Sequence, residues 1–302
     1  MTYRTDAGRI ALLMLFSVAG CATLGKREQT PASPPLPART EPVKPTPMSQ
    51  PADMSPIRPV GYQLPETPDA KSDADAPRRL HREAAAAYAR QPFYIARLKR
   101  REWANGRPRP EETLIFKFRE DPWSVHFKWL GQEGQGREVL YVRGQHGDKL
   151  HILTAANDVP FTPGGRHLAL ALDSVLVRSS SRYPITEAGI GRLIERYGRL
   201  LDAVDRKESG AAAKYLGAAQ RPEYANPLEG VECQLPANFA PEVAQGGKRL
   251  VYFDPTTKFP VVTATYDLGG QEVDYACFDR LQLGVRLDDD DFNPDKLWDK
   301  KP

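Results

Sequence analysis

The chain has 302 residues and a formal net charge of +3, with 27% charged residues. This length allows one large domain or two small ones. The basic residues are scattered and form no cluster with interleaved aromatic residues, so the composition argues against nucleic acid as a partner.

The N-terminus reads as an export signal. Arg4 and Arg9 give the chain a positively charged start, and an apolar run follows at residues 10–18. This run is too short to cross a bilayer as a helix. The run ends in Val18-Ala19-Gly20-Cys21, which resembles the bacterial lipobox. The resemblance implies that residues 1–20 are removed and that Cys21 is acylated, giving the protein a membrane anchor of the palmitate type. A plain secreted protein with an incidental cysteine is the alternative.

A spacer is expected next. Residues 27–78 are rich in Pro, Ala, Ser and Thr and contain one aromatic residue, Tyr62, so they cannot bury enough apolar surface to order themselves. The prolines favour extended conformations, which makes residues 21–78 a lipidated, disordered stalk. A proline motif that binds a partner is the weaker alternative. Ala22 replaces the aspartate that retains many lipoproteins in the inner membrane, which favours a periplasm-facing location on the outer membrane.

Residues 79–302 form the predicted globular domain. A helix is expected at 80–90, where alanine is frequent and Pro92 follows. Alternating apolar and polar residues then predict a meander of strands, and Asn105-Gly106 is typical of a hairpin turn. The expected strands are residues 93–103, 112–119, 123–130, 137–142 and 149–154.

The second half contains a helix and further strands. Residues 190–204 have helical apolar spacing, with Thr186 as a possible N-cap, and 207–219 are expected to be a loop or short helix. Strands are expected at 231–235, 249–254, 259–267 and 272–283. The fold class is therefore α+β: a curved antiparallel sheet with helices on one face.

Several segments resemble a family of bacterial envelope lipoproteins of unknown function, over about residues 86–294. They are residues 117–122 (KFREDP), 128–130 (KWL), 136–142 (GREVLYV) and 181–186 (SRYPIT). The C-terminal order of FPVV, Gly-Gly hairpin and Asp-Phe-Asn-Pro is distantly similar to the LolA/LolB superfamily of lipoprotein carriers and acceptors. This resemblance implies a half-open β-barrel, closed by helices, with an apolar cavity that receives acyl chains.

Apolar side chains that share one face of a strand are candidates for the cavity lining. They are Phe116, Phe118, Trp123, Phe127, Trp129, Leu140 and Val142. The alternative is that these side chains fill the core beneath the helices.

Cys233 and Cys277 are the remaining cysteines, and in an oxidising compartment they are either a disulfide or two buried thiols. The sequence contains no Gly-x-Ser-x-Gly motif and no phosphate-binding glycine loop, and its five histidines lack metal-ligand spacing. We therefore expect no enzymatic activity, no cofactor and no metal.

Two functions fit these features. In the first, a lipid-anchored envelope protein binds an apolar ligand, such as a lipid or a lipoprotein acyl chain. In the second, the domain has a filled core and binds an envelope protein or cell-wall material.

Overall fold

A computed structural model describes residues 70–104, 107–156, 158 and 163–298. The chain divides into two units, residues 1–61 and 62–302, and every described residue belongs to the second. The predicted signal peptide, Cys21 and most of the stalk lie outside the described residues. Within the described ranges, no helix combines the length and apolar character needed to cross a membrane.

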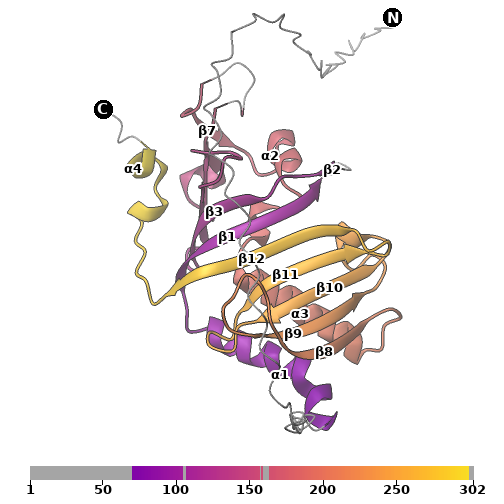
Figure 1. The fold of residues 1–302 in the computed structure, drawn as a ribbon. Helices are drawn as coiled ribbons and strands as arrows, with labels where there is room; N and C mark the ends of the chain where they lie inside the picture. The colour runs from indigo at the N-terminus through magenta and orange to yellow at the C-terminus, as the bar shows by residue number, and fades with distance from the viewer. Residues whose placement is uncertain (1–69, 105–106, 157, 159–162, 299–302) are drawn as a thin grey trace, which may run out of the picture. The chain divides into compact units, whose positions relative to one another are not determined.

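The described unit is built on a single antiparallel sheet of 12 strands (Figure 1). Along the sheet the order is β7-β6-β5-β4-β3-β1-β12-β11-β10-β9-β8, with β2 added beside β1. The strands are β1 (Phe93–Ala104), β2 (Arg107–Pro108), β3 (Glu112–Arg119), β4 (Ser124–Trp129), β5 (Glu138–Val142), β6 (Leu150–Leu153), β7 (His167–Leu170), β8 (Ala212–Ala219), β9 (Leu228–Leu235), β10 (Gly247–Phe253), β11 (Pro260–Asp267) and β12 (Glu272–Leu283).

The sheet remains open because its two edge strands, β7 and β8, do not pair with each other. The meander from β3 to β7 and the meander from β8 to β12 are joined where β1 pairs with both β3 and β12. The predicted fold class, α+β with a curved, half-open antiparallel sheet and helices, is confirmed. The first strand of the described unit, β1, therefore lies beside the last strand, β12.

Two long helices pack on one face of the sheet. Helix α3 (Ile190–Asp205) buries a stripe that includes Ile194, Tyr197 and Leu201, as the apolar spacing predicted. Helix α1 (Ala70–Tyr88) contacts α3 and β8, and the Tyr197 hydroxyl donates to the carbonyl of Pro77 at 3.1 Å. These helices and the strands beneath them enclose the main apolar core.

Three local expectations differ from the structure. The first helix begins at Ala70, ten residues before the expected start at residue 80, because its added turns can pack on α3. The N-cap of α3 is Gly189 and not Thr186, which lies in the short 3-10 helix η2 (Ile185–Glu187). Residues 212–219, expected as a loop or short helix, form strand β8.

Strand β8 was missed because its sequence, AAKYLGAA, contains small residues that rarely favour strands. Pairing with β9 and contact with α1 determine its conformation. A register shift lies between Tyr215 and Gly217, and Gly217 has a φ of 76°, which a residue with a Cβ adopts only at a cost.

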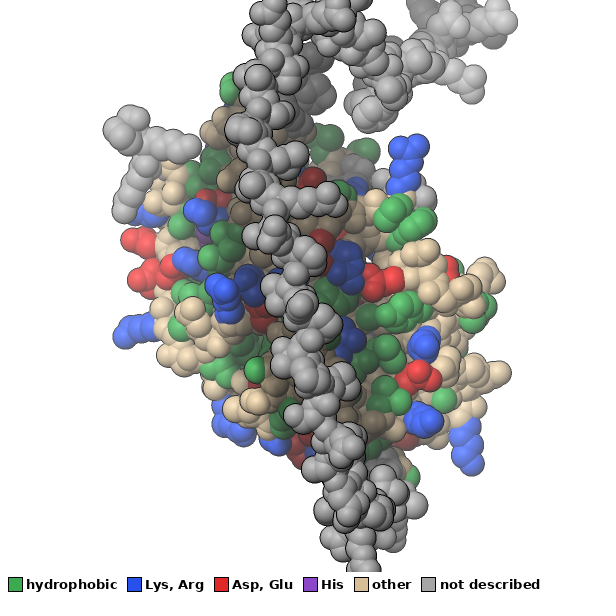
Figure 2. All heavy atoms as spheres, viewed as in Figure 1, with side chains coloured by type: hydrophobic (Ala, Val, Ile, Leu, Met, Phe, Trp, Pro, Cys, Tyr) green, Lys and Arg blue, Asp and Glu red, His purple; other side chains and the backbone are tan. Residues whose placement is uncertain are grey.

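Charged side chains of both signs are interspersed on the face of the molecule seen in Figure 2. The described residues also include cross-strand ion pairs, such as Arg101 with Glu272 at 2.8 Å. This mixture agrees with the small net charge of the sequence.

Candidate functional site

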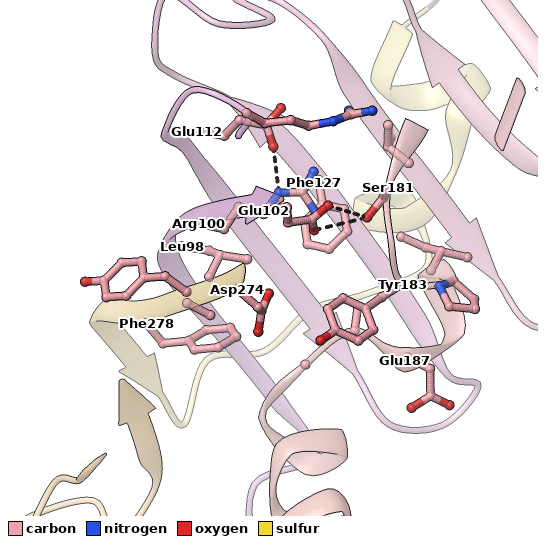
Figure 3. Close-up of a pocket in the computed structure, with 18 of the residues that line it drawn as sticks. Leu98, Arg100, Glu102, Glu112, Phe127, Ser181, Tyr183, Glu187, Asp274 and Phe278 are labelled. Carbon is pink, nitrogen blue, oxygen red and sulfur yellow. Dashed lines mark hydrogen bonds and ion pairs between the residues drawn. The ribbon is translucent and has the colours of Figure 1, made fainter. Parts of the chain in front are cut away.

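A cavity of about 280 Å³ lies between the sheet and a covering segment, residues 177–196 (Figure 3). The floor is formed by β1, β3, β4, β5, β6, β11 and β12. The covering segment contains the end of helix α2 (Val175–Ser180), the turn with η2 and the first turns of α3. Ser174 caps α2 by accepting a hydrogen bond from the Val177 amide at 3.4 Å.

Most of the cavity wall is apolar. Alternate residues of each strand point to the same face, so neighbouring strands supply a continuous apolar floor. The apolar floor residues are Leu98, Phe127, Trp129, Val139, Leu150, Ile152, Ala276 and Phe278. The covering segment contributes Val177, Ile185, Ala188 and Leu193.

One side of the cavity carries an ion-pair network. Arg100 donates through Nε to Glu112 at 2.7 Å, and the indole Nε1 of Trp129 donates to the same carboxylate at 3.0 Å. Burial by itself would raise the pKa of Glu112, but Arg100, Trp129 and Arg137 together lower that pKa below its usual value. Glu112 is therefore a charged, fully engaged group beside the apolar floor.

Glu102 fastens the covering segment to β1. Its carboxylate accepts hydrogen bonds from Ser181 Oγ at 3.1 Å and from the Arg182 amide at 3.3 Å. The Arg182 guanidinium also donates to the carbonyl of Trp103. Because Glu102 is almost completely buried, these bonds are shielded from water and hold the cover in place.

A second carboxylate, Asp274, lies directly opposite Glu102 in the β1–β12 pairing. Asp274 is half-buried, lines the cavity and has no hydrogen-bond partner among the described residues. Burial raises its pKa to about 6; Arg249 acts in the opposite direction, while Glu242 and Glu102 add to the increase. At neutral pH this carboxylate carries a charge in a poorly solvated place.

Tyr183 approaches Asp274 from the covering segment. Its hydroxyl oxygen is buried and, within the described part of the chain, has no hydrogen-bond partner. Figure 3 shows that this hydroxyl points toward the side of the cavity on which Asp274 lies. The ring is held by the Arg196 guanidinium, 4.9 Å from the ring centroid.

Two of the predicted lining residues, Phe127 and Trp129, line the cavity. Phe116, Phe118 and Trp123 are buried in the core instead, where their rings pack against one another and against neighbours. Phe116 stacks on Phe127 with ring centroids 4.8 Å apart, and Trp123 meets Phe118 edge-on at 5.9 Å. For these three residues the filled-core alternative describes the structure.

Leu140 and Val142, also predicted to line a cavity, are not among the residues that line this one. Both belong to a separate cluster with Leu287 and Phe292, on the opposite side of β5 from the cavity. Strand pairing places Val139, not Leu140, beside Phe127. A shift of one residue exchanges the faces of a strand. The one charged residue of β5, Glu138, lies on the same side as Leu140 and Val142, but all five residues are buried, so alternation is a weak guide to the inward face.

Of the two alternatives for Cys233 and Cys277, the structure has the second: both are free, buried thiols and no disulfide joins them. Cys233 lies on β9 and Cys277 on β12, with β10 and β11 between them. Strands three positions apart are separated by about 14 Å, twice the distance that a disulfide allows. Burial raises the pKa of each thiol to about 12, as expected for inert core cysteines.

The polar cavity residues, among them Glu102, Glu112 and Asp274, were not predicted. The sequence does contain a signal for them. Glu112 alternates in step with Leu114, and Asp274 with Phe278, so each places a charge in a row of inward-facing apolar side chains. A charge on the inward face of a half-buried strand is unusual. The described residues contain no group of three or more potential ligands that could hold a metal ion.

The model of the DUF1571 family, described as a protein of unknown function, matches residues 91–297. The chain belongs to this family. The predicted membership of a family of unknown function over about residues 86–294 is thereby confirmed. The match spans every strand of the sheet.

Solved structures with a similar chain path share little sequence with this DUF1571 protein. Lipoprotein LppX of Mycobacterium tuberculosis has 12% identity and a TM-score of 0.42, covering 70% of this chain and 98% of LppX. An uncharacterized conserved protein from Thermus thermophilus has 6% identity and a TM-score of 0.41, and the match covers 75% of this chain and 94% of that protein. A LolA superfamily protein from Nitrosomonas europaea has 11% identity and a TM-score of 0.30, and the match covers 72% of this chain and 97% of that protein. No curated protein matches the chain.

Proposed function

We propose that this protein is a non-enzymatic, lipid-anchored component of the cell envelope that holds the apolar chain of one amphiphile in its cavity. The observation that carries the proposal is the unfilled apolar space beneath residues 177–196. Ligand sites are typically concave and mostly apolar, with a few placed polar groups, and this cavity has that composition.

The size of the cavity limits the ligand. Its volume of about 280 Å³ lies near the lower end of ligand pockets, which span roughly 300–1,000 Å³. A single alkyl chain fits such a volume, whereas the several chains of a mature lipoprotein do not. The bound group is therefore one chain of a lipid or of a small amphiphile.

The anchor is part of the same proposal. Acylation of Cys21 would tether the domain, and the stalk would space it from the membrane surface. We propose a periplasm-facing location, with the outer membrane favoured by Ala22 after the cysteine.

Native mass spectrometry of the full chain, purified gently from cells, tests the function. We expect a co-purifying molecule of defined mass in the wild type and its loss in Ala276→Phe, because the larger side chain fills the cavity from β12. The matched control is Ala218→Phe, at an exposed position on β8 outside the cavity. An apo mass in the wild type, with no uptake of added amphiphiles, would contradict the proposal.

A further inference from the structure

The cavity has an acidic end, formed by Asp274, Tyr183 and Glu102. Asp274 and Glu102 face each other across the β1–β12 pair, and Tyr183 reaches them from the covering segment. Like charges opposite each other in a sheet destabilise the pair. Arg100, 3.3 Å from Glu102, offsets part of this repulsion, whereas Asp274 has no ion-pair partner among the described residues.

Arg249 and Arg196 lie close enough to Asp274 to lower its pKa, but no guanidinium group of the described residues forms an ion pair with it. Arg249 is bound to Glu242 and donates to Thr265 Oγ1 at 3.0 Å. Arg100 is paired with Glu112 at 2.7 Å and with Glu102 at 3.3 Å. Each of these guanidinium groups is thus directed to another acceptor.

Arg196 is likewise engaged elsewhere. It donates to the backbone carbonyls of Arg192 at 3.4 Å and Glu187 at 3.3 Å, and it stacks on Tyr183. Among the described residues, no ion pair includes Asp274. The carboxylate faces the cavity with its hydrogen-bonding capacity free.

Tyr183 provides an independent indication that the acidic end takes a ligand. Its hydroxyl oxygen is buried without a partner among the described residues, although buried polar atoms are nearly always hydrogen-bonded. A phenol hydroxyl can accept a hydrogen bond as well as donate one. The unengaged Asp274 carboxylate and Tyr183 hydroxyl line the same cavity and match a group with several N–H donors.

We propose that the acidic end binds the ammonium group of an amphiphile, with Asp274 and Tyr183 as its hydrogen-bond acceptors and the alkyl chain on the apolar floor. This inference rests on the proposed function and specifies its ligand class: an amine-bearing lipid or alkylamine. An ammonium ion donates up to three charge-assisted hydrogen bonds, which are stronger than neutral ones. An anionic head group at this end would instead meet the unpaired carboxylate of Asp274.

Titration calorimetry of the full chain in lipid nanodiscs, with octylammonium and 1-octanol as probes, tests the inference. The two probes have the same chain length and differ at the head group, and an empty-nanodisc titration corrects for partitioning. We expect the wild type to bind octylammonium at least about tenfold more tightly than 1-octanol, the gain typical of one charge-assisted contact. Asp274→Asn should remove this preference and leave the affinity for 1-octanol unchanged.

Two further variants make the result specific. Tyr183→Phe removes only the hydroxyl and should reduce the preference for octylammonium in part. Asp289→Asn is the matched control, since it removes the same charge from a side chain that is 83% exposed and lies outside the cavity. This control should bind both probes like the wild type.

The outcomes separate the two proposals. Equal affinity of the wild type for both probes, or a preference that persists in Asp274→Asn, would overturn the ammonium site while the cavity function stands. If neither probe binds the wild type, both the proposed function and the ammonium site are wrong.

Discussion

At the scale of the residue, Asp274 is the most informative side chain of the cavity. Burial raises its pKa to about 6, against the opposing effect of Arg249 and with further increases from Glu242 and Glu102. Tyr183 and Arg196 also face it from the covering segment and α3. A carboxylate that destabilises the folded state is typical of a binding site, where stability is lost in exchange for function.

This raised pKa makes stability depend on pH. The folded state keeps the Asp274 proton up to about pH 6, whereas the unfolded state releases it near 3.8. The free energy of unfolding therefore falls as pH rises between these values and stays reduced above them, by on the order of 3 kcal/mol. Asp274→Asn should be more stable than the wild type at pH 7.5.

Urea unfolding of both proteins at several pH values measures the effect. The advantage of Asp274→Asn should shrink toward zero as the pH is lowered from 6 to 4. An advantage that is the same at pH 7.5 and pH 4.5, or a less stable variant at pH 7.5, would show that burial does not perturb Asp274 as described.

At the scale of the element, the covering segment depends on its junction with α3. Gly189 has a φ of 102°, and a Cβ placed there would lie 2.9 Å from the Tyr94 hydroxyl oxygen. That hydroxyl accepts a hydrogen bond from the Ile190 amide at 2.9 Å, which satisfies one of the free donors at the start of α3. Only glycine allows the chain to pass so close to Tyr94.

Gly189→Ala should therefore destabilise the domain and weaken ligand retention together. We expect a loss of roughly 2–3 kcal/mol, from backbone strain plus the displaced Tyr94 contact. Gly270→Ala is the control, because Gly270 also has a positive φ, 81°, but no atom lies within 4 Å of the added Cβ. Thermal melts of the two variants compare them, and an equal loss of stability would mean that the contact with Tyr94 contributes nothing.

At the scale of the whole molecule, the cavity depends on segments from distant parts of the chain. β1 and β12 pair although their residues are about 180 positions apart, as in Arg97 with Asp279. Residues 177–196 then cross this junction and cover it. The proposed anchor and stalk would attach this binding unit to a membrane.

Replacement of Cys21 by alanine tests that attachment. Without the acylated cysteine we expect the protein to lose its lipid and to leave the membrane fraction, since acyl chains supply about 0.8 kcal/mol of binding per buried methylene. Cell fractionation with metabolic labelling by a fatty acid measures both properties. Cys277→Ala serves as the control for loss of a cysteine, and unchanged membrane association of Cys21→Ala would contradict the anchor.

Much of the fold follows from the sequence by itself. Strand alternation in residues such as 112–119 and the apolar stripe of 190–204 are local patterns, and each is present in the structure as β3 and α3. The turn residues Gly269-Gly270 likewise predict a hairpin from adjacent residues alone. These features are encoded within a few consecutive residues, so they are readable before any tertiary contact is known.

Only the tertiary structure decides the cavity. Which side of β5 faces inward, and hence that Val139 rather than Leu140 meets Phe127, depends on pairing between strands. The strand conformation of residues 212–219 and the separation of Cys233 from Cys277 depend on the order of strands in the sheet. The unfilled space and the unpaired carboxylate of Asp274 arise because residues distant in sequence come together without filling the space between them. Local sequence patterns do not predict such long-range contacts.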